Sequence, residues 1–248
     1  MDNQKIRWAL SDWEDTLNLC KERNIQGIRC TIDILGENTR SKGEAKRNLE
    51  SYLSIIKKIK KEKLKASLAV KLTAMGAPFD KTLCEDNLGK ILKEAGKHMV
   101  NVEIDMEGTP LVDYILQTAS SFSRQGFPIT LALQVYLNRT SLDLKEVLKG
   151  RIIVRLVKGA YKGDLEGFDD IQEKFKEAIE LLLHSEKIFF VGTHDPELIE
   201  WMKETLDRKK EFVEFGFLMG LAEKTKTELV NEGWLVSEYI PFGKEKGA

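Results

Sequence analysis

The sequence RIIVRLVKGAYK, residues 151–162, is the most informative stretch of the chain. Five of its first seven residues are apolar, which predicts a buried strand whose side chains alternate between two faces. Arg155 lies inside this apolar run, where a charge needs an anionic partner. Lys158 and Gly159 follow, and glycine lets a backbone approach a ligand closely. The pattern indicates a strand that meets a phosphate or redox cofactor at its C-terminal end, or else a buried Arg155 paired with a carboxylate of a neighbouring strand.

The chain has 248 residues, 42% of them hydrophobic, and a formal net charge of -1. Its length suits one large domain with a substantial core, and its charge balance gives no reason to expect binding of nucleic acid. The three cysteines show no metal-ligand or C-x-x-C spacing, which predicts a reducing compartment, no disulfides and no metal site. Because the chain lacks an apolar signal segment or membrane span, the predicted location is cytoplasmic.

From residue 27 onward, eight short apolar segments alternate with segments of helical spacing. This alternation predicts a parallel sheet with helical crossovers, and eight repeats fit an α/β (β/α)8 TIM-type barrel. A doubly wound open sheet is the alternative, but no glycine-rich phosphate-binding turn occurs early in the chain. Residues 3–24 also show helical spacing. We therefore expect one domain, with residues 1–26 as a helix packed on the barrel and residues 27–248 as the barrel itself.

Polar residues occur near the ends of the predicted strands, where barrels of this type carry their active sites. Alternation places Lys71, Asp105 and Gln134 on strand faces that are otherwise small or polar, while the opposite faces are apolar. Arg155 shares its face with Ile153 and Val157 and is expected near the same end of the barrel. We expect the apolar faces to pack on the helices and these four side chains to point into the barrel near its mouth. The alternative is a buried ion-pair network without a ligand.

Several short motifs resemble those of the proline dehydrogenase family. In chain order they are LGE (35–37), AVKLTA (69–74), IDMEG (104–108), LQVY (133–136), RLVKGAY (155–161), THD (193–195) and YIPFG (239–243). The RLVKGAY match is specific, whereas AVKL and IDME are weak alone. The resemblance implies a distorted (β/α)8 barrel that binds FAD. It also implies oxidation of L-proline to 1-pyrroline-5-carboxylate, the first step of proline catabolism, with electrons passed to a quinone or another acceptor.

The resemblance also implies roles for individual residues. Asp105 and Arg155 would be catalytic, with Arg155 near the flavin N5, and Lys71 and Tyr239 would bind the substrate. The residues that would contact FAD are Met106, Gln134, Arg155, Lys158, Gly159, Ala160, Thr193 and His194. These roles suit the residue chemistry, because fixed cations and donors stabilise the negative charge of a reduced flavin. Lys71, Asp105 and bulk water remain alternatives for taking the proton of the proline amine.

The sequence departs from the family pattern after Gly243. Family members continue into a last helix that carries an Arg-Arg pair for the proline carboxylate, and this sequence ends at Ala248. The resemblance therefore implies that the eighth barrel helix is missing. A trimmed chain, arginines from another subunit, or a different substrate would each explain the difference. An exposed apolar barrel wall would follow, which predicts a homo-oligomer or a partner subunit.

Two other functions fit the same pattern of residues. One is a Schiff-base lyase or aldolase whose nucleophile is Lys71 or Lys158, with a pKa lowered by burial or neighbouring cations. The other is a flavin-binding subunit that is inactive without a partner. If electrons pass to a quinone, a cytoplasmic protein would associate peripherally with the membrane.

Overall fold

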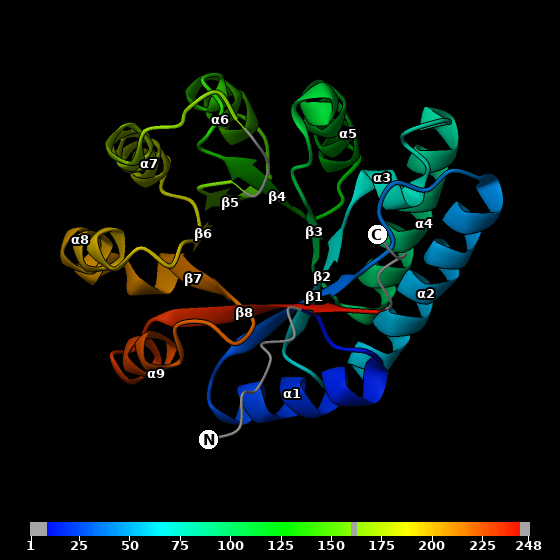
Figure 1. The fold of residues 1–248 in the computed structure, drawn as a ribbon, viewed down its shortest axis with the longest axis horizontal. Helices are drawn as coiled ribbons and strands as arrows, with labels where there is room; N and C mark the ends of the chain where they lie inside the picture. Colours follow the sequence, from blue (N-terminus) through cyan, green and yellow to red (C-terminus); the bar gives the residue numbers. More distant parts are fainter. Residues whose placement is uncertain (1–8, 160–162, 244–248) are drawn as a thin grey trace.

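The strands form one closed parallel barrel in chain order (Figure 1). The computed structural model describes residues 9–159 and 163–243. Within them the strands are β1 (Arg29–Ile34), β2 (Ala66–Val70), β3 (Val102–Ile104), β4 (Ile129–Gln134), β5 (Ile153–Val157), β6 (Phe189–Gly192), β7 (Val213–Leu218) and β8 (Leu235–Phe242). Each strand pairs with the next, and β8 pairs with β1 to close the sheet. The predicted TIM-type barrel is therefore confirmed.

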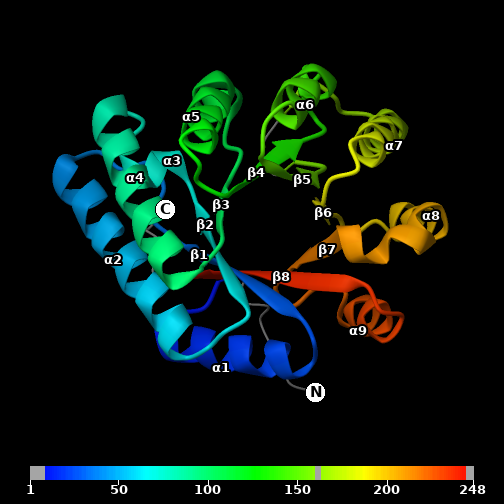
Figure 2. The ribbon, with the colours of Figure 1, turned by 180° about the vertical axis from the view of Figure 1, so that it is seen from behind.

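The helices surround the barrel on its outside, as both views of the ribbon show (Figures 1 and 2). They are α1 (Trp13–Ile25), α2 (Lys42–Lys61), α3 (Leu72–Met75), α4 (Lys81–His98), α5 (Val112–Arg124), α6 (Thr140–Leu148), α7 (Phe168–His184), α8 (Pro196–Leu206) and α9 (Glu223–Asn231), with 3-10 turns η1 (Thr109–Leu111) and η2 (Asp207–Phe212). The apolar strand residues Leu68, Leu131 and Leu156 are fully buried in the main core. This burial follows from the two-residue alternation that the sequence predicted.

The N-terminal helix begins later than the helical spacing predicted. We expected it over residues 3–24, but α1 starts at Trp13. Leu10 instead forms backbone hydrogen bonds with the end of β8, to Pro241 and Gly243 at 2.9 Å each. Asp12 then caps the helix, because its side chain accepts from the backbone N–H of Asp15. Extended pairing with β8 therefore prevents the helix from starting earlier within the described residues.

The outer wall of β8 and β1 is covered, contrary to the expectation of an exposed apolar face. Helix α1 lies along this wall (Figure 1). The Trp13 ring meets the Phe242 ring edge to face at 6.1 Å between centroids. Val236 and Ile240 on β8 are 1% and 0% exposed. The expectation was wrong because the N-terminal helix packs where a barrel's last helix would otherwise be placed.

A short helix that the sequence did not predict follows β2. Strand β2 ends at Val70, and α3 begins at Leu72. The carboxylate of Glu107 accepts from both the backbone N–H and the hydroxyl of Thr73 in the first turn of α3. Thr39 in turn donates to the Thr73 carbonyl at 2.8 Å. These contacts fix the turn in which Lys71 leaves the strand.

Candidate active site

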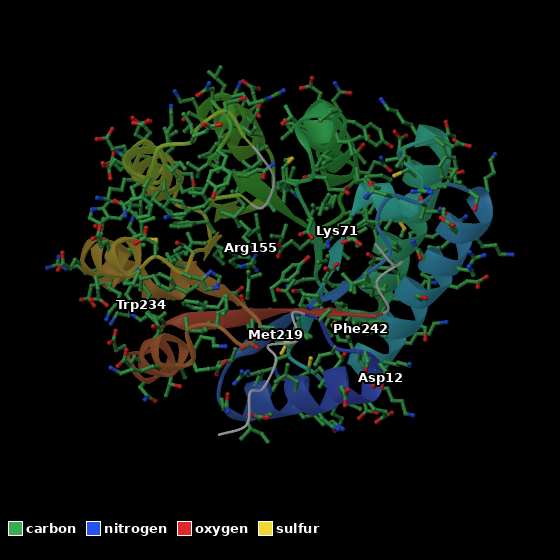
Figure 3. All side chains as sticks on the ribbon, viewed as in Figure 1. Asp12, Lys71, Arg155, Met219, Trp234 and Phe242 are labelled. Atoms are coloured by element: carbon green, nitrogen blue, oxygen red, sulfur yellow. The ribbon has the colours of Figure 1, made fainter. Side chains whose placement is uncertain are left out.

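Five polar side chains meet at the C-terminal end of the barrel, which we call the mouth. The Lys71 ammonium lies 2.6 Å from Asp33 of β1, 3.1 Å from Glu37 in the following loop and 3.5 Å from Asp105 after β3. It also donates to the Tyr239 hydroxyl at 3.2 Å, and Tyr239 donates to Asp105 at 2.6 Å. Lys71 points into the barrel interior in Figure 3. These residues, the Lys71 cluster, bring together the predicted Lys71, Asp105 and Tyr239.

Charge is unbalanced in the Lys71 cluster. Burial alone would lower the pKa of Lys71, but Asp105, Asp33 and Glu37 outweigh it and raise that pKa, so the side chain is an ammonium. Burial and the Asp105 charge hold the pKa of Tyr239 well above its usual range, so it is a neutral phenol. One cation therefore faces three carboxyl groups. A surplus of negative charge in a half-buried site suits a ligand that brings a positive charge.

The carboxyl groups of the cluster differ in their titration. Burial raises the pKa of Asp33 to about 6, although the nearby Lys71 opposes this shift. Burial also acts on Glu37, but there Lys71 and backbone donors prevail and lower its pKa. Of Asp33 and Glu37, Asp33 is therefore the carboxyl group that changes charge closer to neutral pH.

Arg155 points inward as predicted but lies deeper than Lys71, below the last inward residue of its strand. Its guanidinium donates to Glu103 of β3 at 2.6 Å and to Glu214 of β7 at 3.1 Å. It also lies over the Phe190 ring at 4.9 Å. Burial opposes its charge, but Glu103 and Glu214 raise the pKa of Arg155, so it is a cation. The contacts of Arg155 are therefore those of the alternative prediction, a buried arginine paired with carboxylates of neighbouring strands. The four side chains that were predicted to point inward do not form one cluster.

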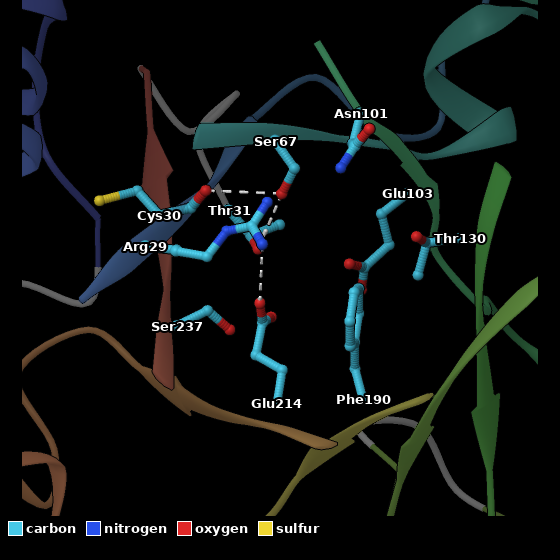
Figure 4. Close-up of a pocket in the computed structure, with 10 residues that line it drawn as sticks. All are labelled: Arg29, Cys30, Thr31, Ser67, Asn101, Glu103, Thr130, Phe190, Glu214 and Ser237. Carbon is cyan, nitrogen blue, oxygen red and sulfur yellow. Dashed lines mark hydrogen bonds and ion pairs between the residues drawn. The ribbon is translucent and has the colours of Figure 1, made fainter. Parts of the chain in front are cut away.

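A small polar cavity lies at the opposite, N-terminal end of the barrel interior (Figure 4). Its lining residues are Arg29, Cys30, Thr31, Ser67, Asn101, Glu103, Thr130, Phe190, Glu214 and Ser237. Arg29 approaches Glu214 at 3.7 Å, and the Ser67 hydroxyl lies 3.1 Å from that of Thr31. The two carboxylates that bind Arg155 therefore also line this inner cavity.

Several predicted cofactor residues lie around the mouth. Gln134 is buried and donates to the Glu107 carbonyl at 3.2 Å, and Met106 is buried as well. Lys158 pairs with Asp195 at 2.6 Å. Burial opposes ionisation of Asp195, but hydrogen bonds from Lys158 and Gln172 lower its pKa. Ala160, also predicted to contact the cofactor, lies outside the described residues.

Gly159 has a structural reason to be glycine. Its φ angle is +134°, a conformation that residues with a Cβ rarely adopt. A Cβ at this position would lie 2.5 Å from the ring of Tyr136. The glycine in the RLVKGAY motif therefore permits close packing of the loop after β5 against the loop after β4.

The remaining predicted cofactor residues are Thr193 and His194, which follow β6. Thr193 is buried, and its hydroxyl accepts from the Asp195 N–H at 3.2 Å. The Nε2 atom of His194 accepts from the Leu218 N–H at 3.0 Å. Partial desolvation by neighbouring groups and the nearby Lys226 lower the pKa of His194, so the ring is neutral and its proton lies on Nδ1. His194 can therefore donate from Nδ1 to a ligand.

These groups fit a cofactor that carries phosphates and gains negative charge. Lys158 is a partly exposed cation, and His194 presents an N–H donor near it in the loop after β6.

No set of three or more His, Cys, Asp and Glu side chains in the described residues is arranged to hold a metal ion. Among those residues, no helix is long and apolar enough to cross a membrane.

A closed (β/α)8 barrel with ionisable side chains converging at the carboxyl ends of its strands defines a TIM-barrel enzyme. The sequence profile of the family described as "Proline dehydrogenase" matches residues 16–164. The chain is also 30% identical to proline dehydrogenase 2 of Bacillus subtilis over 242 residues, which cover 95% of this chain and 80% of that protein. The chain belongs to the proline dehydrogenase family.

One further relative and one solved structure are also similar to this chain. Proline dehydrogenase of Deinococcus radiodurans is 25% identical over 234 residues, covering 88% of this chain and 74% of the relative. The crystal structure of proline utilization A from Bdellovibrio bacteriovorus superposes with a TM-score of 0.89 at 22% identity, covering 96% of this chain. This chain spans only 31% of that longer protein, and at this identity the likeness establishes the fold alone.

Asp33 and Glu37 were not predicted as site residues. The sequence contains a signal for Asp33, because Arg29, Thr31 and Asp33 alternate with apolar residues in β1 as Glu103 and Asp105 do in β3. Glu37 belongs to the LGE motif but lies beyond the strand, where alternation gives no direction. Its place beside Lys71 depends on how the loop after β1 folds.

Proposed function

We propose that this protein is an FAD-dependent enzyme that oxidises L-proline to 1-pyrroline-5-carboxylate and passes the electrons to a quinone or another acceptor. Membership of the proline dehydrogenase family supports proline oxidation. The observation that carries the proposal in this chain is the Lys71 cluster, which offers one cation and three carboxyl groups at the barrel mouth. Proline carries one carboxylate and one ammonium and matches both kinds of charge.

Each charged part of proline has a counterpart in the cluster. Lys71 would meet the substrate carboxylate, and Tyr239 would line the pocket beside it. Asp105 is more accessible than Asp33, with a side chain 13% exposed against 3%, so it would meet the substrate ammonium. Because Lys71 and Tyr239 both keep their protons at neutral pH, Asp105 is the better candidate to accept the amine proton. Loss of that proton lets hydride leave the adjacent carbon.

Most of the predicted cofactor residues in the described part of the chain lie just after the ends of β3, β5 and β6, and Gln134 is the last residue of β4. FAD would accept the hydride from the carbon next to the substrate nitrogen. Lys158, Gly159, Thr193, His194, Gln134 and Met106 would hold it, as would Ala160. Arg155 is a fixed cation beneath the mouth, and a fixed cation stabilises negative charge that develops during reduction.

The Schiff-base alternative fits the geometry less well. A nucleophilic lysine must be neutral, which requires a lowered pKa. The carboxylates around Lys71 raise its pKa instead, and Lys158 is paired with Asp195 at 2.6 Å. Neither lysine is therefore prepared to attack a carbonyl group.

The absorption spectrum tests the proposal directly. Purified protein reconstituted with FAD should show flavin bands that bleach when L-proline is added without oxygen, and D-proline serves as a control. A protein that binds no FAD contradicts the proposal. A protein that binds FAD but is bleached only after a second chain is added is the partner-dependent subunit.

Replacing Arg155 with Met tests its catalytic role. Flavin reduction by proline should fall about 100-fold, the effect of removing one preorganised electrostatic contact. Because Glu103 and Glu214 would lose their partner, the variant R155M should be compared with R155M/E103Q/E214Q, which removes the unpaired charges. Reduction that stays fast in the triple variant would exclude Arg155 from the mechanism.

A further inference from the structure

Asp33 is the most deeply buried carboxylate of the Lys71 cluster. It lies on the inward face of β1 and is 2% exposed. Its Oδ2 atom lies 2.6 Å from the Lys71 ammonium, the shortest of that ammonium's contacts in the cluster. Asp33 therefore determines how deep in the barrel the charge of Lys71 is held.

The arrangement of Asp33 is not that of a purely stabilising ion pair. Its second oxygen, Oδ1, is buried without a hydrogen-bond partner among the described residues. Buried carboxylates are normally satisfied at both oxygens, and an unsatisfied one costs stability. Lys71 already has Glu37 and Asp105 as partners, so a third carboxylate is not needed to neutralise its charge. A role in the site explains the unpaired Oδ1 atom of Asp33, whereas a purely stabilising ion pair does not.

Charged and titratable groups from the elements packed against Asp33 face its carboxylate. They belong to Lys71 after β2, Asp105 after β3 and Glu37 after β1, with the phenols Tyr239 of β8 and Tyr52 of α2. Lys71 is the only cation among these groups. If Asp33 lost its charge, the Lys71 ammonium would be drawn toward Asp105 and Glu37.

We propose that Asp33 is a positioning residue that holds the Lys71 ammonium at the floor of the site, 2.6 Å from Asp33 and 3.5 Å from Asp105, and so leaves Asp105 only partly compensated and available to the substrate ammonium. The inference rests on the proposed function, because it takes proline as the ligand. It adds a residue that does not touch the substrate and acts through Lys71. It also predicts that the charge state of Asp33 controls which part of proline the site favours.

The effect should follow pH. Asp33 has a pKa of about 6 because it is buried, so it is mostly ionised at pH 8 and mostly protonated at pH 5. Protonation releases Lys71 to neutralise Asp105, which weakens binding of the substrate ammonium. kcat/KM for proline should therefore fall as the pH decreases through about 6.

The test compares Asp33→Asn with Glu238→Gln. The first removes the charge of Asp33 and keeps its size. The second is a matched control, because Glu238 is also a buried carboxylate paired with a lysine, but on the outer wall. Flavin reduction by proline is measured without oxygen from pH 5 to pH 9, with inhibition by cyclopentanecarboxylate, a proline analogue without the amine.

In D33N, KM for proline at pH 8 should rise about 10-fold to 100-fold, as for other residues that orient a ligand through another group. The fall near pH 6 should disappear, and cyclopentanecarboxylate should bind more tightly because one negative charge is gone. E238Q should keep the wild-type profile. If D33N weakens proline and cyclopentanecarboxylate equally, or keeps the fall near pH 6, the inference is wrong.

Two further measurements separate the possible failures. Wild-type protein that proline does not reduce contradicts the proposed function, whereas reduction of wild type with an unchanged D33N profile contradicts only the role of Asp33. If D33N does not fold, as judged by circular dichroism, Asp33→Ser replaces it. The serine variant should show the same opposite changes for proline and cyclopentanecarboxylate, and their absence overturns the inference.

Discussion

Two lysines of this barrel are buried among carboxylates, and the balance of charge around them differs. Lys226 of α9 is fully buried on the outer wall, where it contacts Glu238 of β8 and lies 2.7 Å from Glu223. Arg23 of α1 binds the same two carboxylates, at 2.9 Å and 2.8 Å. In this wall cluster (Arg23, Lys226, Glu223 and Glu238) two cations meet two anions, and the network joins α1, α9 and β8.

The Lys71 cluster has the opposite character. One cation meets three carboxyl groups there, and Glu37 at its edge is 27% exposed in its side chain. A network with balanced charge can hold elements of the fold together, whereas a network with a surplus of one charge can receive a ligand of the opposite charge. Exposure does not separate the two clusters, because Glu223 of the wall cluster is 51% exposed in its side chain. The comparison indicates that net charge, more than burial of a lysine, distinguishes a structural ion cluster from a site.

Breaking the wall cluster should have the largest effect on stability. Lys226→Met leaves Glu238 in a fully buried position with less compensation, and removal of one partner of a buried pair costs about 3–5 kcal/mol. Urea unfolding measures the change. Lys224→Met on the same helix removes only the exposed pair with Glu228 and should change stability by less than about 1 kcal/mol. Equal effects of the two variants would show that the wall cluster has no special role.

Breaking the Lys71 cluster should affect activity instead. Lys71→Met removes its only lysine, and kcat/KM for proline should fall about 10²-fold to 10³-fold, as for loss of a preorganised charge contact. FAD content should be unchanged, which the flavin spectrum checks. The exposed Lys65, just before β2, is the control position, and Lys65→Met should behave as wild type. A K71M variant within tenfold of wild type would contradict the assignment of the cluster.

The stability of the protein should depend on the charge of Asp33. Its pKa in the folded state, about 6, exceeds the usual value of 3.8, so folding favours the protonated form. This contribution is fully present below about pH 4 and is lost as the pH rises through about 6. Relative to D33N, wild-type stability should therefore fall between pH 4 and pH 7, by about 3 kcal/mol at most. Parallel unfolding curves over that range would show that Asp33 keeps an ordinary pKa.

Weakening α1 without changing the wall cluster should have the smallest effect. Asp12 caps this helix, and Asp12→Ala should cost about 1 kcal/mol. The contacts of Arg23 lie at the other end of the helix and should persist. Ser41→Ala, which removes the corresponding cap of α2, is a matched control for the size of the effect. A loss of several kcal/mol in thermal unfolding of D12A alone would show that α1 detaches as a whole.

Much of the fold could be predicted from local patterns. The eight strands and their inward and outward faces follow from alternation, and the helices between them follow from segments of helical spacing. The start of α1 could not be predicted, because Leu10 pairs with a strand more than 200 residues away in the chain. The bend into α3 could not be predicted either, because it depends on a hydrogen bond to Glu107, which lies in the loop after β3.

The sequence alone determined the family, the barrel and the direction in which Lys71, Asp105 and Arg155 point. Only the tertiary structure decided that Lys71 and Asp105 share one cluster while Arg155 pairs deeper with Glu103 and Glu214. The physical reason is that alternation along a strand is local, whereas the depth of a side chain and its neighbours across the barrel depend on the stagger of all the strands around the closed sheet.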